Sequence, residues 1–239
     1  MSRPFLKAQW RYLAMLNFEV DPAVLAPLVP KGTLLDDEGG RHYISLVGFL
    51  FLDTHIFGFP AFFHDSFEEV NLRFYVRREL AEESRRGVVF IREIVSRPLV
   101  AETAKLTYNE PYTTTPTQHT LVRSADALQS VEYLFGPSDR VCRLSLHPDG
   151  RPVALPAGSH EEFIAERAWG FTRQRDGGTI EYAVDHPRWN VWRDARWELD
   201  GPLGDFFQGP FSSILSGAPA SAFVAEGSAV AVHLPQRIA

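Results

Sequence analysis

The stretch EEVNLRFYVRREL, residues 68–80, decides the fold class because its polarity alternates from one residue to the next. Successive side chains of a β-strand point to opposite faces of the sheet, so this pattern predicts a strand with one buried face. The apolar face holds Val70, Leu72, Phe74 and Val76. The other face holds Glu69, Asn71, Arg73, Tyr75 and Arg77.

The polar face of this strand has two interpretations, and the sequence leaves both open. On an ordinary sheet it faces solvent. On a barrel whose outer surface is covered by helices, the same side chains line the interior. In that case Arg73 would hold a carboxylate in bidentate fashion and Glu69 would serve as acid or base, with Asn71 and Tyr75 as further ligand contacts.

Other segments add strands, tight turns and short helices. A charged hairpin loop leads to a strand at 88–95, Asp-Gly-Gly at 176–178 predicts a second hairpin, and residues 189–199 are predicted to form one strand. Residues 34–52 are expected to form strand, turn and strand, while residues 53–67 look like a long aromatic loop. Asp21 before Pro22 and Ser159 before Glu162 are helix N-cap patterns. We therefore expect a mainly β fold with a few short helices, as an antiparallel barrel or cone in a single domain over residues 1–239.

Composition narrows the classes of function. The formal net charge is −6 and basic residues form no long run, which argues against nucleic-acid binding. Cys142 is the single cysteine, so no internal disulfide can form, and a reducing cytoplasm is expected. The first ten residues lack the apolar run of a signal peptide, and the longest apolar stretch, residues 44–52, is too short to span a membrane.

The segment AKLTYNEPYTTT, residues 104–115, contains two candidate catalysts. A helix is predicted from Pro98 to Asn109, and its helical angles place Lys105 opposite the apolar residues, in solvent near Glu102. Pro111 ends the helix and leaves Tyr112 at a helix-to-strand corner. Tyr112 either anchors that corner as a buried aromatic or aims its hydroxyl at a ligand as a catalytic acid.

Other catalytic motifs are sparse. His186 precedes a proline in DHPRWNVW, residues 185–192, and is either structural or a ligand contact. The histidines form no His-x-x-x-His pair and a Cys-x-x-Cys pair is missing, so neither a metal nor a cofactor is predicted. Cys142 lies on an apolar strand pattern, which is typical of a buried, inert thiol.

Five segments in this order resemble the YqjF-like family, a domain of unknown function that is similar to the acetoacetate decarboxylase superfamily. They are VPKGTLLDDEGGRHYISLVGF, FEEVNLRFYVR, RPLVAETAKLTYNEPY, GSHEEFIAERAWGF and DHPRWNVW. The resemblance covers nearly the whole chain. It implies an antiparallel cone or barrel around one pocket.

The resemblance also bears on chemistry. In the decarboxylases a Pro-Lys pair ends the corresponding helix, and its lysine forms the Schiff base. Here Pro111 and Tyr112 occupy those positions, and Lys105 comes seven residues too early. Glu69 resembles the glutamate that opens a strand in those enzymes. The resemblance therefore implies a retained pocket without Schiff-base chemistry.

Three functions remain open. The first is a pocket that binds a small organic molecule, such as an acid. The second is a lysine-independent lyase or hydrolase that acts on a small carboxylic acid with Glu69 as base, Arg73 as anion clamp and Tyr112 as acid. The third is a non-catalytic interaction or structural protein whose contact surface is the aromatic loop 56–63. Whether the chain forms a homo-oligomer is also left open.

Overall fold

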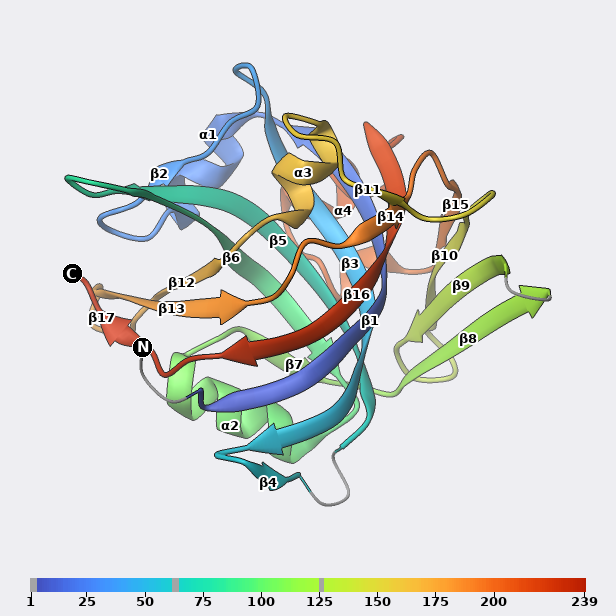
Figure 1. Cartoon of the computed structure of the whole chain (residues 1–239), viewed down its shortest axis with the longest axis horizontal. Coiled ribbons are helices and arrows are strands. Elements are labelled where there is room, and N and C mark those ends of the chain that lie inside the picture. Colours follow the sequence, from blue (N-terminus) through green and yellow to red (C-terminus); the bar gives the residue numbers. More distant parts are fainter. Residues whose placement is uncertain (1–3, 62–64, 125–126) are drawn as a thin grey trace.

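Strands from both ends of the chain form a closed barrel in this computed structural model, which describes residues 4–61, 65–124 and 127–239. Hydrogen-bonded pairing runs β16-β1-β3-β5-β6-β12-β13 and returns from β13 to β16 (Figure 1). All of these pairs are antiparallel except β6 with β12. This confirms the predicted mainly β barrel. The barrel strands are β1 (Leu6–Val20), β3 (His42–Ile56), β5 (Phe67–Glu79), β6 (Ser84–Val95), β12 (Trp169–Arg173), β13 (Thr179–Asp185) and β16 (Ser221–Val232).

A second, smaller sheet packs against the outside of the barrel. Its order is β15 (Arg196–Asp200), β10 (Cys142–His147), β9 (Ala127–Phe135) and β8 (Thr117–Ser124). The side chains of Val70, Leu72, Phe74 and Val76 are fully buried in the core that joins the two sheets. The predicted apolar face of β5 is thus confirmed, and its covering is largely this second sheet.

Gly48 of β3 permits the close approach of the small sheet. A Cβ atom at this position would lie 2.5 Å from Cδ2 of Tyr133 on β9, well inside van der Waals contact. The Tyr133 ring is fully buried and its hydroxyl donates to the Tyr12 carbonyl at 2.8 Å. A glycine on the barrel wall therefore provides the space for an aromatic ring of the second layer.

The β12–β13 hairpin turns at the predicted Asp-Gly-Gly and completes the barrel. Its pairing with the neighbouring strands β6 and β16 is short, and these two short pairings are called seams. On one side Trp169 and Gly170 pair with Gly87 and Val88 of β6. On the other side Val184 and Asp185 pair with two residues near the end of β16. The long strands β1, β3 and β5 share far more extensive ladders.

Short helices close the ends of the barrel. α2 lies across one end, and α3 lies at the other end (Figure 1). Both predicted N-caps are confirmed, because Asp21 accepts from the Ala23 N–H at 2.8 Å and Ser159 accepts from the Glu162 N–H at 3.1 Å. The helices are α1 (Pro22–Leu25), η1 (Ala26–Leu28), α2 (Pro98–Tyr108), α3 (His160–Ala165), η2 (Leu203–Asp205) and α4 (Pro210–Leu215).

Two expected strands differ from the structure. Residues 189–199 are not one strand: β14 (Asn190–Trp192) belongs to the barrel sheet and β15 to the small sheet. The chain changes sheets at Asp194, whose φ is +51°. The expected strand, turn and strand at 34–52 are present as β2 (Leu34–Leu35), a turn closed by the Glu38–Arg41 bridge, and β3, but β2 pairs with β5 instead of β3.

The remaining short strands extend the sheets. β4 (Phe59–Pro60) folds back on the end of β3, so the predicted aromatic loop begins as a hairpin, and its residues 62–64 lie outside the described part. β7 (Tyr112–Thr114) pairs in parallel with β6, and β11 (Val153–Ala154) and β17 (Gln236–Arg237) pair with β14 and β13. Among the described residues, no helix combines the length and the hydropathy needed to cross a membrane.

Candidate active site

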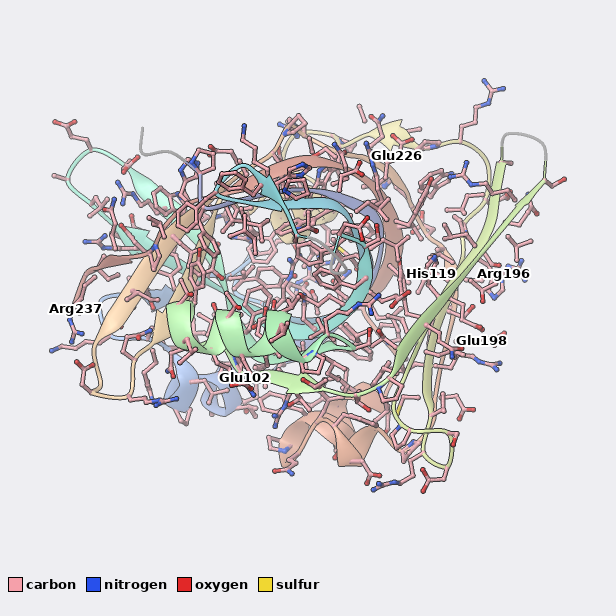
Figure 2. The ribbon with its side chains drawn as sticks, turned by 90° about the horizontal axis from the view of Figure 1, so that it is seen from below. Glu102, His119, Arg196, Glu198, Glu226 and Arg237 are labelled. Atoms are coloured by element: carbon pink, nitrogen blue, oxygen red, sulfur yellow. The ribbon has the colours of Figure 1, made fainter. Side chains whose placement is uncertain are left out.

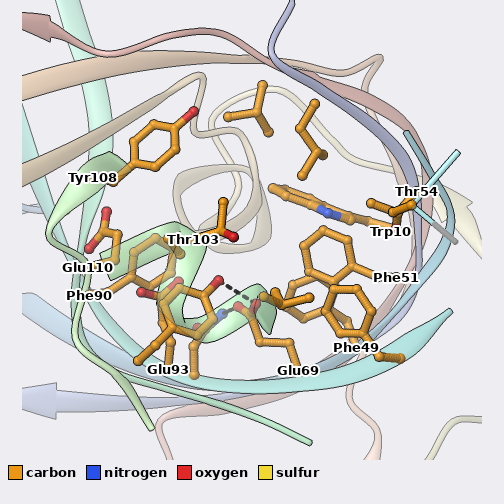
Figure 3. A pocket seen from close by; sticks show the side chains of 18 of the residues that line it. Trp10, Phe49, Phe51, Thr54, Glu69, Phe90, Glu93, Thr103, Tyr108 and Glu110 are labelled. Carbon is orange, nitrogen blue, oxygen red and sulfur yellow. Dashed lines mark hydrogen bonds between the residues drawn. The ribbon is translucent and has the colours of Figure 1, made fainter. Parts of the chain in front are cut away.

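The barrel encloses a cavity of about 290 Å³ between β1, β3, β5, β6 and α2. Its lining is mostly apolar, with Trp10, Phe49 and Phe51 gathered on one side (Figure 3). Glu69 and Glu93 lie at the base of the same view. An apolar chamber with a few convergent polar groups is the usual form of a small-molecule site.

The polar face of β5 points into this cavity. Glu69, Asn71 and Arg73 all line it and are 2%, 2% and 8% exposed. The structure therefore settles the two interpretations of the alternating strand in favour of the interior. Every second side chain faces inward because the outward face is occupied by the core shared with the small sheet.

Tyr75 shares this inward face but does not line the cavity. Its hydroxyl is bonded to Ser45 Oγ, and its ring lies 5.4 Å from the Phe163 ring and 4.8 Å from the Arg167 guanidinium. It lies farther along β5, toward the end of the barrel covered by α3. The predicted ligand contact by Tyr75 is therefore corrected: its side chain is engaged within the core.

Tyr112 reaches Glu69 because of the corner that follows α2. Asn109 ends the helix in the left-handed conformation, and β7 then pairs with β6 so that Tyr112 lies opposite Glu93. The Tyr112 hydroxyl donates to Glu69 Oε2 at 2.8 Å, and Asn71 Nδ2 donates to Glu69 Oε1 at 3.0 Å. Both oxygens of the Glu69 carboxylate are thus held in place.

Glu93 and Glu110 also line the cavity, and the sequence reasoning missed both. Glu110 Oε1 accepts hydrogen bonds from Thr172 Oγ1 at 2.5 Å and from the Tyr182 hydroxyl at 2.8 Å. Glu93 Oε2 and Glu110 Oε2 are buried without a hydrogen-bond partner among the described residues. The sequence could have identified Glu93 as a candidate site residue, because it is a charged residue within the mainly apolar strand VVFIREIV.

Burial changes the acidity of these carboxyl groups. Loss of hydration raises the pKa of Glu69 to about 7, opposed by its bonds to Asn71 and Tyr112 and by the charge of Arg73. Burial likewise raises the pKa of Glu110 to about 7. The pKa of Glu93 lies well above its usual range because of burial and the negative charges of Glu110 and Glu69. The cluster therefore retains protons near neutral pH.

Among the described residues that line the cavity, Arg73 is the one cationic side chain. Its Nη2 donates to the Ile164 carbonyl at 3.4 Å, and its buried Nε has no acceptor among the described residues. A guanidinium with an unused donor can bind a carboxylate or a carbonyl oxygen. Arg73 and Glu69 lie on the same inward face of β5, so the cavity offers both an anion contact and a group that can take up or release a proton.

A lysine nucleophile is missing from the cavity wall. The sequence contains three lysines, Lys7, Lys31 and Lys105, and all three are described and lie outside the lining. Lys105 Nζ pairs with Glu102 Oε1 at 2.8 Å, as predicted. Glu102 lies on the outer side of α2 (Figure 2).

The side of α2 opposite Lys105, which carries Leu99, Val100 and Leu106, faces the barrel only in part, although the helix and the position of Lys105 are confirmed. Leu99 and Leu106 are 65% and 84% exposed, whereas the buried residues are Ala101 and Tyr108. The helix lies across the barrel end and presents Leu99 to the rim of the cavity. Leu99, Val100 and Thr103 line the cavity whereas Leu106 does not, so helical spacing alone identified the inward face only in part.

His186 lies away from the cavity, and its predicted ligand contact is corrected. Its ring stacks on Trp189 with centroids 4.2 Å apart, and its Nδ1 lies 3.0 Å from the Pro187 carbonyl. Cys142 is fully buried, as predicted, and burial raises its pKa to about 12. In the described part of the chain, His, Cys, Asp and Glu side chains form no group of three or more suited to a metal ion.

Comparison with known proteins agrees with this geometry. The model of the DUF2071 family, described as an uncharacterized conserved protein, matches residues 7–227. No curated protein matches the chain. Acetoacetate decarboxylase from Legionella pneumophila has a similar structure, with a TM-score of 0.69, 12% identity and coverage of 100% of this chain and 88% of the other.

Two further solved structures are similar. An acetoacetate decarboxylase-like enzyme from Sphingomonas wittichii gives a TM-score of 0.69 at 14% identity, over 99% of this chain and 94% of the other. The enduracididine biosynthesis enzyme MppR, complexed with pyruvate, gives 0.66 at 13% identity, over 100% of this chain and 92% of the other. At these identities the likeness shows a shared fold.

Proposed function

Because the chain belongs to the DUF2071 family, whose function is uncharacterized, we propose its function from its own cavity: it binds a small organic acid without Schiff-base chemistry. The observation that carries the proposal is the Tyr112–Glu69 hydrogen bond in an apolar-walled cavity that Arg73 also lines. The ligand carboxylate would pair with Arg73, and its apolar body would lie against Trp10 and Phe51.

The charge balance of the site supports an acid that binds together with a proton. One arginine faces three carboxyl groups, so an incoming anion is tolerated when those carboxyls are protonated. The raised pKa values of Glu69 and Glu110, each about 7, permit this near neutral pH. A related fold that binds pyruvate, in MppR, supports the class of a small keto acid.

A lysine-independent lyase or hydrolase reaction is the second candidate. A carboxylate with a pKa near 7 is suited to accept and return a proton, and Glu69 is fixed by two donors at the cavity wall. Tyr112 would protonate the product and Arg73 would hold the acid. The interior position of these groups favours both cavity-based functions over a purely structural or interaction protein.

Isothermal titration with a panel of short keto acids, each paired with its methyl ester, tests the proposal. We expect Arg73→Gln to weaken acid binding about tenfold or more, because a charge-assisted contact contributes roughly 1.5–3 kcal/mol. Ester binding should not depend on Arg73. Arg92→Gln is the matched control, because Arg92 lies on β6, outside the lining, and donates to Thr113 Oγ1 at 2.8 Å. Acid binding that is indifferent to Arg73 would contradict the proposal.

The setting of this function is also a proposal. A lone cysteine supports work in a reducing cytoplasm, and a net charge of −6 supports a small-molecule ligand rather than nucleic acid. Light scattering would establish whether the chain acts alone or as a homo-oligomer.

A further inference from the structure

A second polar cluster lies near α3, at the end of the barrel opposite α2 (Figure 1). Ser221 begins β16, His160 begins α3, and Glu38 lies in the turn between β2 and β3. His160 Nε2 lies 2.8 Å from Ser221 Oγ, and His160 Nδ1 lies 2.6 Å from Glu38 Oε2. Three segments far apart in sequence thus bring a hydroxyl, an imidazole and a carboxylate into one line.

The donor directions in this line are fixed by its two ends. An ionised carboxylate only accepts, so His160 Nδ1 carries the proton and donates to Glu38. In the neutral imidazole His160 Nε2 is then the acceptor of the Ser221 hydroxyl. The edge of the Tyr43 ring, with centroids 4.8 Å apart, packs against the imidazole and holds its orientation.

Hydrogen bonds from buried groups next to Ser221 also favour donation of its hydroxyl proton to His160. Asn17 is fully buried, and its Nδ2 donates to Ser221 Oγ at 2.8 Å. The Asn17 Oδ1 atom accepts from Ser45 Oγ at 2.6 Å, and Ser45 in turn bonds the Tyr75 hydroxyl. Asn17 thus occupies one acceptor lone pair of Ser221 Oγ, which leaves the hydroxyl hydrogen free to be donated to His160 Nε2.

We propose that Ser221, His160 and Glu38 form a serine nucleophile site that accepts the acyl group of a carboxylic ester. Nucleophile, base and orienting carboxylate in hydrogen-bond sequence are recognised by this geometry on many unrelated folds. This activity is separate from acid binding in the barrel cavity.

The reaction balances with groups that are present. Ser221 Oγ forms a bond to the ester carbonyl carbon while His160 Nε2 takes the hydroxyl proton. The bond to the alkoxy oxygen then breaks, and His160 returns the proton to that leaving alcohol. Water, with His160 again as base, releases the carboxylic acid and restores Ser221. Glu38 is a positioning residue that fixes the imidazole and stabilises its charged form.

The surroundings are open and polar. Ser221 and His160 are each partly exposed, so a substrate can reach them. Glu38 and Ser159 also line a neighbouring hollow that contains Asp37, Glu162 and Glu166 as well as the cationic Arg86 and Arg188. Because carboxylates outnumber the two guanidinium groups in this lining, the hollow suits an ester with a polar, uncharged leaving group.

Active-site labelling of the intact protein provides the first test. Diisopropyl fluorophosphate forms a phosphorus–oxygen bond to an activated serine and releases fluoride. We expect one equivalent of label, mapped to Ser221 by peptide mass spectrometry. Label at another residue, or none on the folded wild-type protein, would overturn the proposal without recourse to any variant.

Variants provide the second test, with release of p-nitrophenolate from p-nitrophenyl acetate as the readout. Ser221→Ala should abolish both label and release, and His160→Gln should slow them about 100-fold or more, the range expected for loss of a general base. Ser228→Ala is the matched control, because Ser228 lies on the same strand and accepts from Trp189 Nε1 rather than facing a histidine. Equal rates in Ser221→Ala and wild type would overturn the proposal.

The role of Glu38 is tested by comparing one variant that removes its negative charge with one that keeps it. Glu38→Gln keeps the size of the side chain and should slow labelling about tenfold or more, whereas Glu38→Asp should restore part of the rate. A purely structural carboxylate would give equal labelling in both variants at equal thermal stability. Keto-acid binding in the cavity should be unchanged in all of these variants, which separates this inference from the proposed function.

Discussion

The Tyr112 hydroxyl donates to Glu69 Oε2 at 2.8 Å although the two residues lie 43 positions apart in the sequence. One residue begins β7 after a proline, and the other lies near the start of β5. The contact exists because β7 pairs with β6, which in turn pairs with β5. The turn between α2 and β7, which the sequence alone shows as a helix end, therefore supplies a side chain to the cavity.

We predict that Tyr112→Phe keeps the fold and changes the free energy of unfolding by no more than about 1 kcal/mol, the net contribution of one hydrogen bond. The variant should nonetheless weaken acid binding, because Glu69 loses a donor that orients it. Chemical denaturation and calorimetry measure the two effects. Tyr182→Phe, which removes a donor to Glu110, is the comparison. Unchanged acid binding in Tyr112→Phe would leave the residue as an anchor of the corner.

The raised pKa of Glu69 predicts a stability that falls as pH rises from about 4.5 to about 7. In this window the native state still holds a proton that the unfolded chain has released, so each rise in pH favours unfolding. The slope is about 1.4 kcal/mol per pH unit for each such proton. Glu110, with a pKa also near 7, acts in the same direction.

Glu69→Gln checks this pH dependence. The amide cannot titrate, so urea denaturation from pH 5 to pH 8 should show a shallower loss of stability than in the wild-type protein. Glu82→Gln, at an exposed position, should keep the wild-type slope. Identical slopes in all three proteins would show that Glu69 does not hold a proton in the native state.

Borohydride trapping with acetoacetate or pyruvate is expected to give no adduct at Lys105. The Lys105 ammonium pairs with Glu102 outside the cavity, where its charged form is favoured and attack on a carbonyl is not. Intact-mass spectrometry measures the outcome, and an acetoacetate decarboxylase with its catalytic lysine serves as the positive control. A stable adduct mapped to Lys105 would refute the assignment.

Phe74→Ala should destabilise the protein by roughly 3–5 kcal/mol, the usual cost of truncating a core aromatic. Phe74 is fully buried where β5 meets the small sheet. Phe59→Ala, at a position that is 74% exposed, should change stability by less than about 0.5 kcal/mol. Thermal and urea unfolding compare the two, and a loss below about 1 kcal/mol for Phe74→Ala would question the strand register.

Local patterns predicted those parts of the fold that depend on local physics. Alternation over residues 68–80 gave β5 and its buried face, and the caps at Asp21 and Ser159 gave two helix starts. Alternation could not say whether Glu69 faced solvent or a lumen, because both environments favour the same side chains. That choice depends on ring closure between β13 and β16, more than 30 residues apart in the sequence.

The parts of the site that were missed depend on long-range pairing. Glu110 resembled a simple residue before a proline, but it meets Thr172 and Tyr182 from the distant β12–β13 hairpin. Leu99 resembled a core residue of α2, yet the helix lies across the barrel end and leaves it at the rim. Tyr75 faced the predicted side, but its distance along β5 placed it beyond the cavity.

The short seams of the β12–β13 hairpin have a consequence for motion. Regions with few backbone ladder bonds open with less free energy than the long central strands, so amide hydrogens of this hairpin should exchange faster than those of β1 and β3. Tyr182 lies on that hairpin and holds Glu110. Each local opening of the hairpin would therefore break the hydrogen bond from Tyr182 to the buried Glu110 carboxyl. The rate at which Glu110 exchanges its proton with solvent would then be set by the rate at which the hairpin opens.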